Sequence, residues 1–209
     1  MTVTWELVRA GHLVRSVRLA PLLPAVATAA VLLVTRRDGT PDALGDLRLL
    51  ALLLALGCGY VLDDSAAGLL QASPWSLARR LTLRMGCATA VTAPLWTLML
   101  AYLLPSAPAA DRWDLGLGTT IELAAALGVV WAVAAWARRR GVDHPGLITS
   151  PALLAALLLA ASMSRAPMLV STGPQWTTAH LRWSAVLAAA TVTLLAAMRD
   201  PAHRLPHIP

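Results

Sequence analysis

The chain has 209 residues, of which 57% are hydrophobic and only 13% charged, and its mean hydropathy is +0.65. Soluble domains carry about 25% charged residues, so this composition predicts an all-α integral membrane protein with one membrane domain spanning residues 1–209. The net charge of +6 comes from 17 arginines and no lysine. The missing lysine excludes a P-loop ATP site, which uses a lysine to reach the phosphates. Because the arginines lie at the ends of apolar runs, anionic lipid headgroups explain the charge better than nucleic acid does.

The first segment, residues 1–18, predicts an amphipathic helix. Val3, Leu7 and Val14 recur at helical spacing, while Arg9 and Arg15 fall elsewhere on the helical wheel. A basic helix of this kind lies in the plane of the membrane surface, so we expect an N-terminal interface helix.

Six apolar segments follow, and each predicts a transmembrane helix. Their approximate ranges are 19–34, 41–62, 85–104, 115–137, 146–163 and 183–198. The second is free of charge only from Leu49 to Leu62, which is short for a bilayer of about 30 Å. We therefore expect that span to begin near Pro41, with Asp46 and Arg48 at the level of the outer headgroups.

The distribution of arginine predicts the orientation. With the N-terminus inside, eleven of the 17 arginines fall on the inner side and six on the outer side. The positive-inside rule then favours a multi-pass protein of the plasma membrane with both termini in the cytoplasm.

The connection at residues 63–84, between the second and third spans, combines acids, a helix-start signal and arginines. Asp63 and Asp64 open it, and Ser73-Pro74 is typical of an N-cap followed by the first helical position. It ends on basic residues that precede the next span: Arg79, Arg80 and Arg84. We expect a short cytoplasmic helix here that contacts a partner protein.

The acid pair Asp63-Asp64 allows two interpretations. Acids are favoured at the start of a helix by the helix dipole, which is the structural interpretation. Acid pairs also bind Mg²⁺ in sites that handle phosphate, which would suit a membrane enzyme acting on lipids or phosphate. Such sites need further carboxylates, and position 67 is alanine.

Two further features suggest function at the outer side. Residues 164–182 are neither charged enough for a simple loop nor apolar enough for a span, and predict short helical pieces that partly re-enter the outer interface. Glu122 is the one acid within an apolar run, and intramembrane acids are candidates for a transport pathway. Alternatively, Glu122 reaches the membrane interface or pairs with Arg112 or Arg182. We find no spacing typical of a catalytic site or of a metal site, and expect no cofactor in this chain.

The order of these segments resembles the permease subunit of an ABC-2 type, exporter-like ABC transporter. The stretch from Leu62 to Pro74, followed by Arg79, Arg80 and Arg84, resembles the loop between spans two and three of small actinobacterial permeases of this kind. The resemblance implies that this loop is a coupling helix. It also implies separate ATPase subunits, which carry ATP and Mg²⁺, and a second permease copy or a paralogue. The second span and the outer segments are shorter than is usual in that family.

Three functions therefore remain open from the sequence. The first is a membrane-spanning exporter subunit, in which Asp63, Asp64, Ser73, Pro74, Arg79 and Arg80 couple to the ATPase and Glu122 lines the pathway. The second is a lipid-handling enzyme that uses Asp63-Asp64 with a metal. The third is a membrane scaffold that does not transport.

Overall fold

The structure is a computed structural model that describes residues 19–35, 43–63, 76–162, 168–170 and 173–199. Within these ranges it is all-helical, as the sequence predicts. The elements are η1 (Ala20–Leu22), α2 (Leu23–Thr35), α3 (Ala43–Val61), α4 (Leu77–Leu103), η3 (Leu104–Ser106), α5 (Arg112–Arg139), α6 (Gly146–Ser162) and α7 (Trp176–Met198). The predicted interface helix at 1–18 and most of the 63–84 connection lie outside the described residues.

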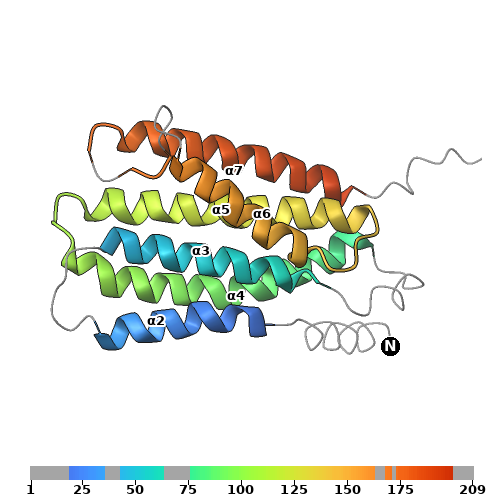
Figure 1. The fold of residues 1–209 in the computed structure, drawn as a ribbon, viewed down its shortest axis with the longest axis horizontal. Helices are drawn as coiled ribbons and strands as arrows, with labels where there is room; N and C mark the ends of the chain where they lie inside the picture. The colour runs from blue at the N-terminus through green and yellow to red at the C-terminus, as the bar shows by residue number, and fades with distance from the viewer. Residues whose placement is uncertain (1–18, 36–42, 64–75, 163–167, 171–172, 200–209) are drawn as a thin grey trace, which may run out of the picture.

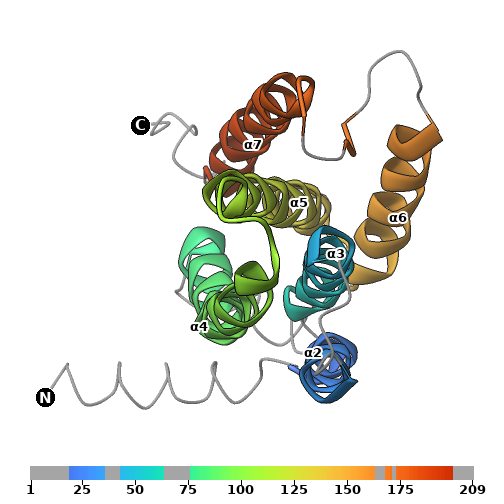
Figure 2. The same cartoon turned by 90° about the vertical axis from the view of Figure 1, so that its left-hand side faces the viewer.

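Successive helices run in opposite directions along one bundle (Figure 1). Helix α5 is central and packs most extensively against α7 and α3, while α2 packs against α3 and α4 (Figure 2). Helix α6 packs against α3 and α5 but makes no comparable contact with α7. Because the helix directions alternate, the helix starts are divided between the two ends of the bundle. One carries the starts of α3, α5 and α7, and the other carries the starts of α4 and α6.

In the described part of the chain, four helical segments are long and apolar enough to cross a membrane, which supports the predicted membrane character. They are Ala43–Val61, Ala78–Ser106, Arg112–Arg139 and Trp176–Met198. The apolar helices at the first and fifth predicted spans, Ala20–Thr35 and Gly146–Leu159, are shorter. Six membrane crossings therefore stay a prediction.

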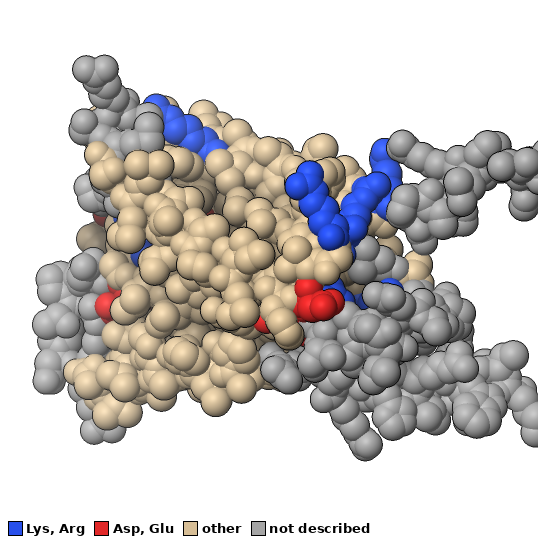
Figure 3. Space-filling view, turned by 45° about the vertical axis from the view of Figure 1, so that its right-hand side comes forward, with Lys and Arg blue, Asp and Glu red and all other residues tan. Residues whose placement is uncertain are grey.

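The outward faces of the bundle carry large apolar side chains. Leu158 of α6, Leu181 and Val192 of α7 and Val34 of α2 are each more than 60% exposed. Figure 3 shows a broad surface with few charges, on which the arginines lie toward the two ends and more of them at the end on the right. An apolar surface of this extent suits contact with lipid rather than with water.

Two helices begin earlier than the sequence predicts. Helix α4 begins at Leu77, where the Ser76 hydroxyl accepts a hydrogen bond from the Arg79 backbone N–H over 3.3 Å. The N-cap of this helix is Ser76, and the helix begins eight residues before the predicted third span at 85–104. The helix start predicted at Ser73-Pro74 lies outside the described residues. Helix α7 begins at Trp176, so residues 176–182 form its first turns and are not separate re-entrant pieces. In both helices the polar first turns lower the local hydropathy without ending the helix.

Glycine allows a close approach between α3 and the start of the first apolar segment. A Cβ atom added at Gly57 would lie 2.7 Å from the Pro21 carbonyl oxygen and 2.8 Å from Leu22 Cδ2. The Pro21 oxygen belongs to the backbone, so it cannot move aside as a flexible side chain would.

We expect Gly57→Ala to lower the free energy of unfolding by about 1–3 kcal/mol through overpacking. Gly86→Ala is the matched control, because an added Cβ there has no atom within 4 Å. In the control, the better helix propensity of alanine should be neutral or stabilise by up to about 1 kcal/mol. Thermal unfolding of the detergent-solubilised variants measures both changes, and equal behaviour of the two would contradict the close packing.

Candidate functional site

Glu122, the acid within an apolar run that the sequence singled out, forms a partly buried ion pair with Arg48. The Glu122 residue is 5% exposed. Arg48 Nε donates to Glu122 Oε2 over 2.8 Å, and Arg48 Nη2 donates to Oε1 over 2.6 Å. Two parallel hydrogen bonds of this kind are the strongest arrangement available to an arginine and a carboxylate. The pair joins α3 to α5.

This partner differs from the ones predicted. We expected Glu122 to pair with Arg112 or Arg182, and Arg48 to lie at the headgroups. Arg112 instead donates to the backbone oxygens of Ala107 and Pro105, just beyond the end of α4. Arg48 pairs with Glu122, which gives the buried carboxylate the countercharge that it needs. The level of Arg48 relative to the headgroups stays a prediction.

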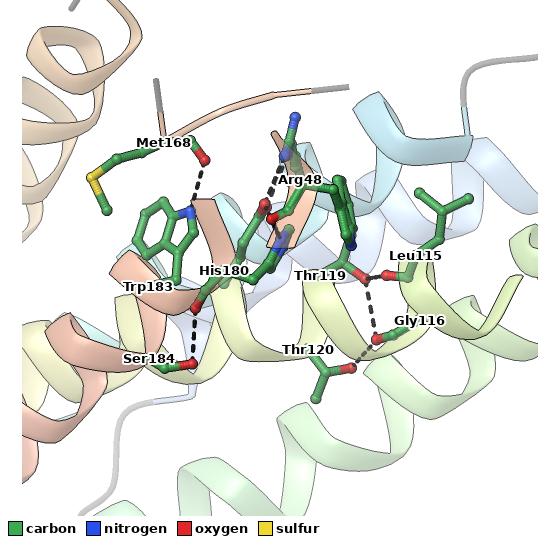
Figure 4. A network of polar contacts seen from close by, with 11 residues as sticks. Arg48, Leu115, Gly116, Thr119, Thr120, Met168, His180, Trp183 and Ser184 are labelled. Atoms are coloured by element: carbon green, nitrogen blue, oxygen red, sulfur yellow. Dashed lines mark hydrogen bonds and ion pairs between the residues drawn. The ribbon is translucent and has the colours of Figure 1, made fainter. Parts of the chain in front are cut away.

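His180 of α7 contacts the same carboxylate from the other side. Its Nε2 atom lies 3.3 Å from Glu122 Oε1 but forms no hydrogen bond. Its Nδ1 atom lies 2.8 Å from the Trp176 carbonyl oxygen, and the two rings pack with their centroids 4.0 Å apart. Figure 4 shows Arg48 and His180 converging on one point from different helices. We call Arg48, Glu122 and His180 the polar cluster.

Gly118 makes room for this arrangement one turn before Glu122. A Cβ atom at Gly118 would lie 2.6 Å from His180 Nε2 and would clash with the Trp176 ring. The first turns of α7 therefore lie directly on the backbone of α5.

We expect Gly118→Ala to push His180 away from Glu122 and to lower the free energy of unfolding by about 1–3 kcal/mol. Gly116→Ala on the same helix is the control, because its added Cβ would approach only the end of the Leu104 side chain. Unfolding by titration with sodium dodecyl sulfate measures the difference. A Gly118→Ala protein as stable as the control would show that this contact is looser than described.

An apolar cavity of about 240 Å³ adjoins the polar cluster. Arg48 and Glu122 form one end of it. Its remaining walls come from α3, α5, α6, α7 and the short segment at Leu169: Leu49, Ala51, Leu52, Ala126, Leu154, Leu157, Leu158, Leu169 and Trp183. The indole of Trp183 donates to the Met168 carbonyl oxygen over 2.9 Å, which fixes the 168–170 segment against the cavity (Figure 4).

His180 faces a second hollow, of about 220 Å³, along the α5–α7 groove. Asp114, Gly118, Trp176 and Ser184 contribute to its lining. Because Glu122 contacts both Arg48 and His180, the polar cluster stands between the two hollows. The polar cluster brings together ionisable side chains from three helices, α3, α5 and α7.

At the opposite end of the bundle, Asp63 joins three helices. Its Oδ1 atom accepts a hydrogen bond of 2.7 Å from the backbone N–H of Gly146, at the start of α6. Its backbone oxygen accepts one of 2.5 Å from Arg84 Nη1, on α4. Asp63 itself follows the end of α3, and the residues after it, where the acid pair predicts a helix start, lie outside the described residues. Asp63 caps the start of a distant helix.

The other residues predicted at this loop divide into two groups. Asp64, Ser73 and Pro74 lie outside the described residues. Arg79 and Arg80 lie in the first turn of α4, directly after the undescribed stretch 64–75.

Further arginines make contacts between helix ends at the same end of the bundle. Arg139 donates to the Ala196 carbonyl oxygen near the end of α7 over 2.8 Å. Its guanidinium and that of Arg140 lie 5.7 and 5.5 Å from the centre of the Trp136 ring. Several of these arginines are therefore built into helix-end contacts.

Three or more histidine, cysteine or acidic side chains that lie together could hold a metal ion. In the described part of the chain, no three of them come together. Cys58 and Cys87 are both free thiols. One oxygen of Asp63 is already engaged by Gly146, so the acid pair offers less to a metal than its sequence indicates.

Comparison with protein families, curated proteins and solved structures finds no match for this chain. Functional inference therefore rests on its own residues.

The sequence identified Glu122 but missed both of its partners. Arg48 stood near the expected end of a span, and its charge was assigned to the headgroups. His180 stood in a segment interpreted as interfacial. One available signal was the spacing of Trp176 and His180, four residues apart, which on a helix places both side chains on one face.

Proposed function

We propose that this chain is the membrane-spanning subunit of an ATP-driven ABC exporter, coupled to separate ATPase subunits. The observation that carries the proposal is the pair of contacts made by α6. At its start, Gly146 is held by Asp63, next to the 64–75 connection. Farther along, Leu154, Leu157 and Leu158 form a wall of the cavity beside Glu122. One helix thus links the proposed coupling loop to the proposed pathway.

The mechanism follows from the stiffness of a helix. From Gly146 to Leu158 is about 18 Å along the helix axis. A partner that moves the 64–75 connection displaces Asp63 and the start of α4, and with them the start of α6. Because a helix moves as a unit over this length, the cavity wall is displaced relative to α5.

The orientation and partners belong to the same proposal. The arginine-rich end lies in the cytoplasm, following the positive-inside rule, and the polar cluster lies toward the outer side of the plasma membrane. ATP and Mg²⁺ are held by the ATPase subunits, and a second copy or a paralogue completes the pathway. Anionic lipids contact the exposed arginines.

The test is purification of the tagged chain from its native membranes, followed by identification of what accompanies it. We expect a stoichiometric subunit with a Walker A motif and ATP hydrolysis by the complex. A complex that holds no such ATPase would overturn the proposal. In that case, metal-dependent turnover by the chain alone would support the lipid-handling enzyme, and absence of any turnover would support the scaffold.

A further inference from the structure

We propose that the cavity beside Arg48 binds an amphiphile with an anionic head, and that His180 takes up one proton for each anion bound. This inference rests on the proposed function, which places the cavity on the transport pathway, and adds the chemical class of the ligand. Its test uses the chain alone, so its outcome is independent of the ATPase partner.

The cavity suits an apolar tail. Apart from Arg48 and Glu122 at one end, its lining consists of leucines, alanines and Trp183. Leu154 is 40% exposed and Leu158 is 64% exposed, so the cavity is not sealed along α6. Figure 2 shows α6 standing apart from α7 on this side. An amphiphile dissolved in the bilayer can therefore enter sideways, with its tail among the leucines.

The charged end of the cavity suits an anionic head. Arg48 is the one cation among the described residues of the lining. Two of the five N–H donors of its guanidinium bind the Glu122 carboxylate. An oxyanion presents the same acceptor geometry as that carboxylate, so it competes with Glu122 for the Arg48 guanidinium.

His180 offers Glu122 a second partner, but only when protonated. The Trp176 carbonyl can only accept, so Nδ1 carries the hydrogen in the contact of 2.8 Å. In the neutral ring, Nε2 then presents a lone pair toward Glu122 Oε1 at 3.3 Å, which explains the missing hydrogen bond. Protonation of Nε2 turns this unfavourable contact into an ion pair.

Charge balance links the binding of an anion at Arg48 to the protonation of His180. With Arg48 and Glu122 ionised and His180 neutral, the polar cluster has no net charge. An anion that joins it alone leaves one uncompensated negative charge in a buried place, which is costly in a medium of low dielectric constant. A proton on His180 restores neutrality, with the anion on Arg48 and Glu122 on His180.

Other charges near His180 do not replace this proton. Asp114 of α5 lines the same hollow as His180 and is negative, so it favours the protonated ring. Arg48 of α3, which binds the same Glu122 carboxylate, disfavours it. Glu122 is the acidic side chain in direct contact with the ring.

The experiment uses the purified full chain in dodecyl maltoside, with decanesulfonate as the probe because its head is ionised at every pH used. Binding is measured by isothermal titration calorimetry at about pH 8 and about pH 5.5, on either side of the usual range of histidine. Buffers with different ionisation enthalpies report the number of protons taken up. Decanol is the uncharged control, and His180→Gln removes the titrating ring.

We expect decanesulfonate to bind more tightly at the lower pH, by up to about tenfold per pH unit, with uptake of about one proton. His180→Gln should bind with little pH dependence and no proton uptake. Decanol should bind more weakly, independently of pH. Three results would overturn the proposal: decanol binding as tightly as decanesulfonate, wild-type binding without proton uptake, or an unchanged pH dependence in His180→Gln. Because proton uptake is measured on the wild-type chain, the test stands even if the variant does not fold.

Discussion

Replacing Arg48 by leucine should lower the free energy of unfolding by about 3–5 kcal/mol, because the Glu122 carboxylate is left buried without its countercharge. Glu122 is 5% exposed, and both of its oxygens accept from Arg48. The Glu122 side chain is 6% exposed and the Arg48 side chain 20% exposed, so the carboxylate is the more deeply buried member of the pair. Thermal unfolding in detergent, followed by tryptophan fluorescence, measures the change.

The double variant Arg48→Leu/Glu122→Leu tests whether the unpaired Glu122 carboxylate causes this loss of stability. Replacing both members of a buried pair by apolar residues is often neutral or stabilising, so the double variant should regain most of the lost stability. Arg199→Leu, at an exposed arginine, is the control for loss of one positive charge. A double variant as unstable as Arg48→Leu would mean that the aliphatic packing of Arg48, and not its charge, stabilises the bundle.

The same pair of variants separates stability from function. The double variant lacks the cation to which we assign the anionic head, so it should fold but fail to bind decanesulfonate. A double variant that binds as the wild type does would remove Arg48 from the proposed site.

Replacing Asp63 by alanine should have the second largest effect, at the other end of the bundle. The Gly146 N–H then loses its acceptor, which costs about 1–3 kcal/mol at a partly buried position. The start of α6 also loses a negative charge that the helix dipole favours. Under the proposed function, transport per ATP hydrolysed should fall, because α6 no longer follows the connection 64–75.

Asp63→Asn is the matched comparison. The amide oxygen of asparagine still accepts from Gly146, so this variant should lose only the smaller charge contribution of about 0.3–1 kcal/mol. Thermal unfolding of the solubilised chain, and transport by the complex with its ATPase, are the two measurements. Equal losses in the alanine and asparagine variants would show that the carboxylate charge, rather than the hydrogen bond to Gly146, holds α6.

The apolar helices could be predicted from the sequence because each one carries its own signal. A run of leucine, alanine and valine has no stable alternative to a helix inside a bilayer, whatever its neighbours are. Their polar ends were harder to predict. The first turns of α4 and α7 contain Arg79, Arg80, Thr177 and His180, which lower the local hydropathy although the backbone stays helical. Local hydropathy reports contact with lipid, whereas helix boundaries depend on capping and packing.

Sequence alone predicted an all-helical protein whose long helices are apolar enough to cross a membrane, and it singled out Glu122 as an acid within an apolar run, because composition and hydropathy are sums over neighbouring residues. The tertiary structure decided which cation meets that acid. Arg48 and Glu122 are 74 residues apart, and His180 comes from a third helix. Asp63 and Gly146 are likewise joined across 83 residues. Such contacts depend on how each helix is rotated and how far it is shifted along its axis in the bundle. Close packing at glycines such as Gly57 and Gly118 fixes both, and no local sequence pattern encodes them.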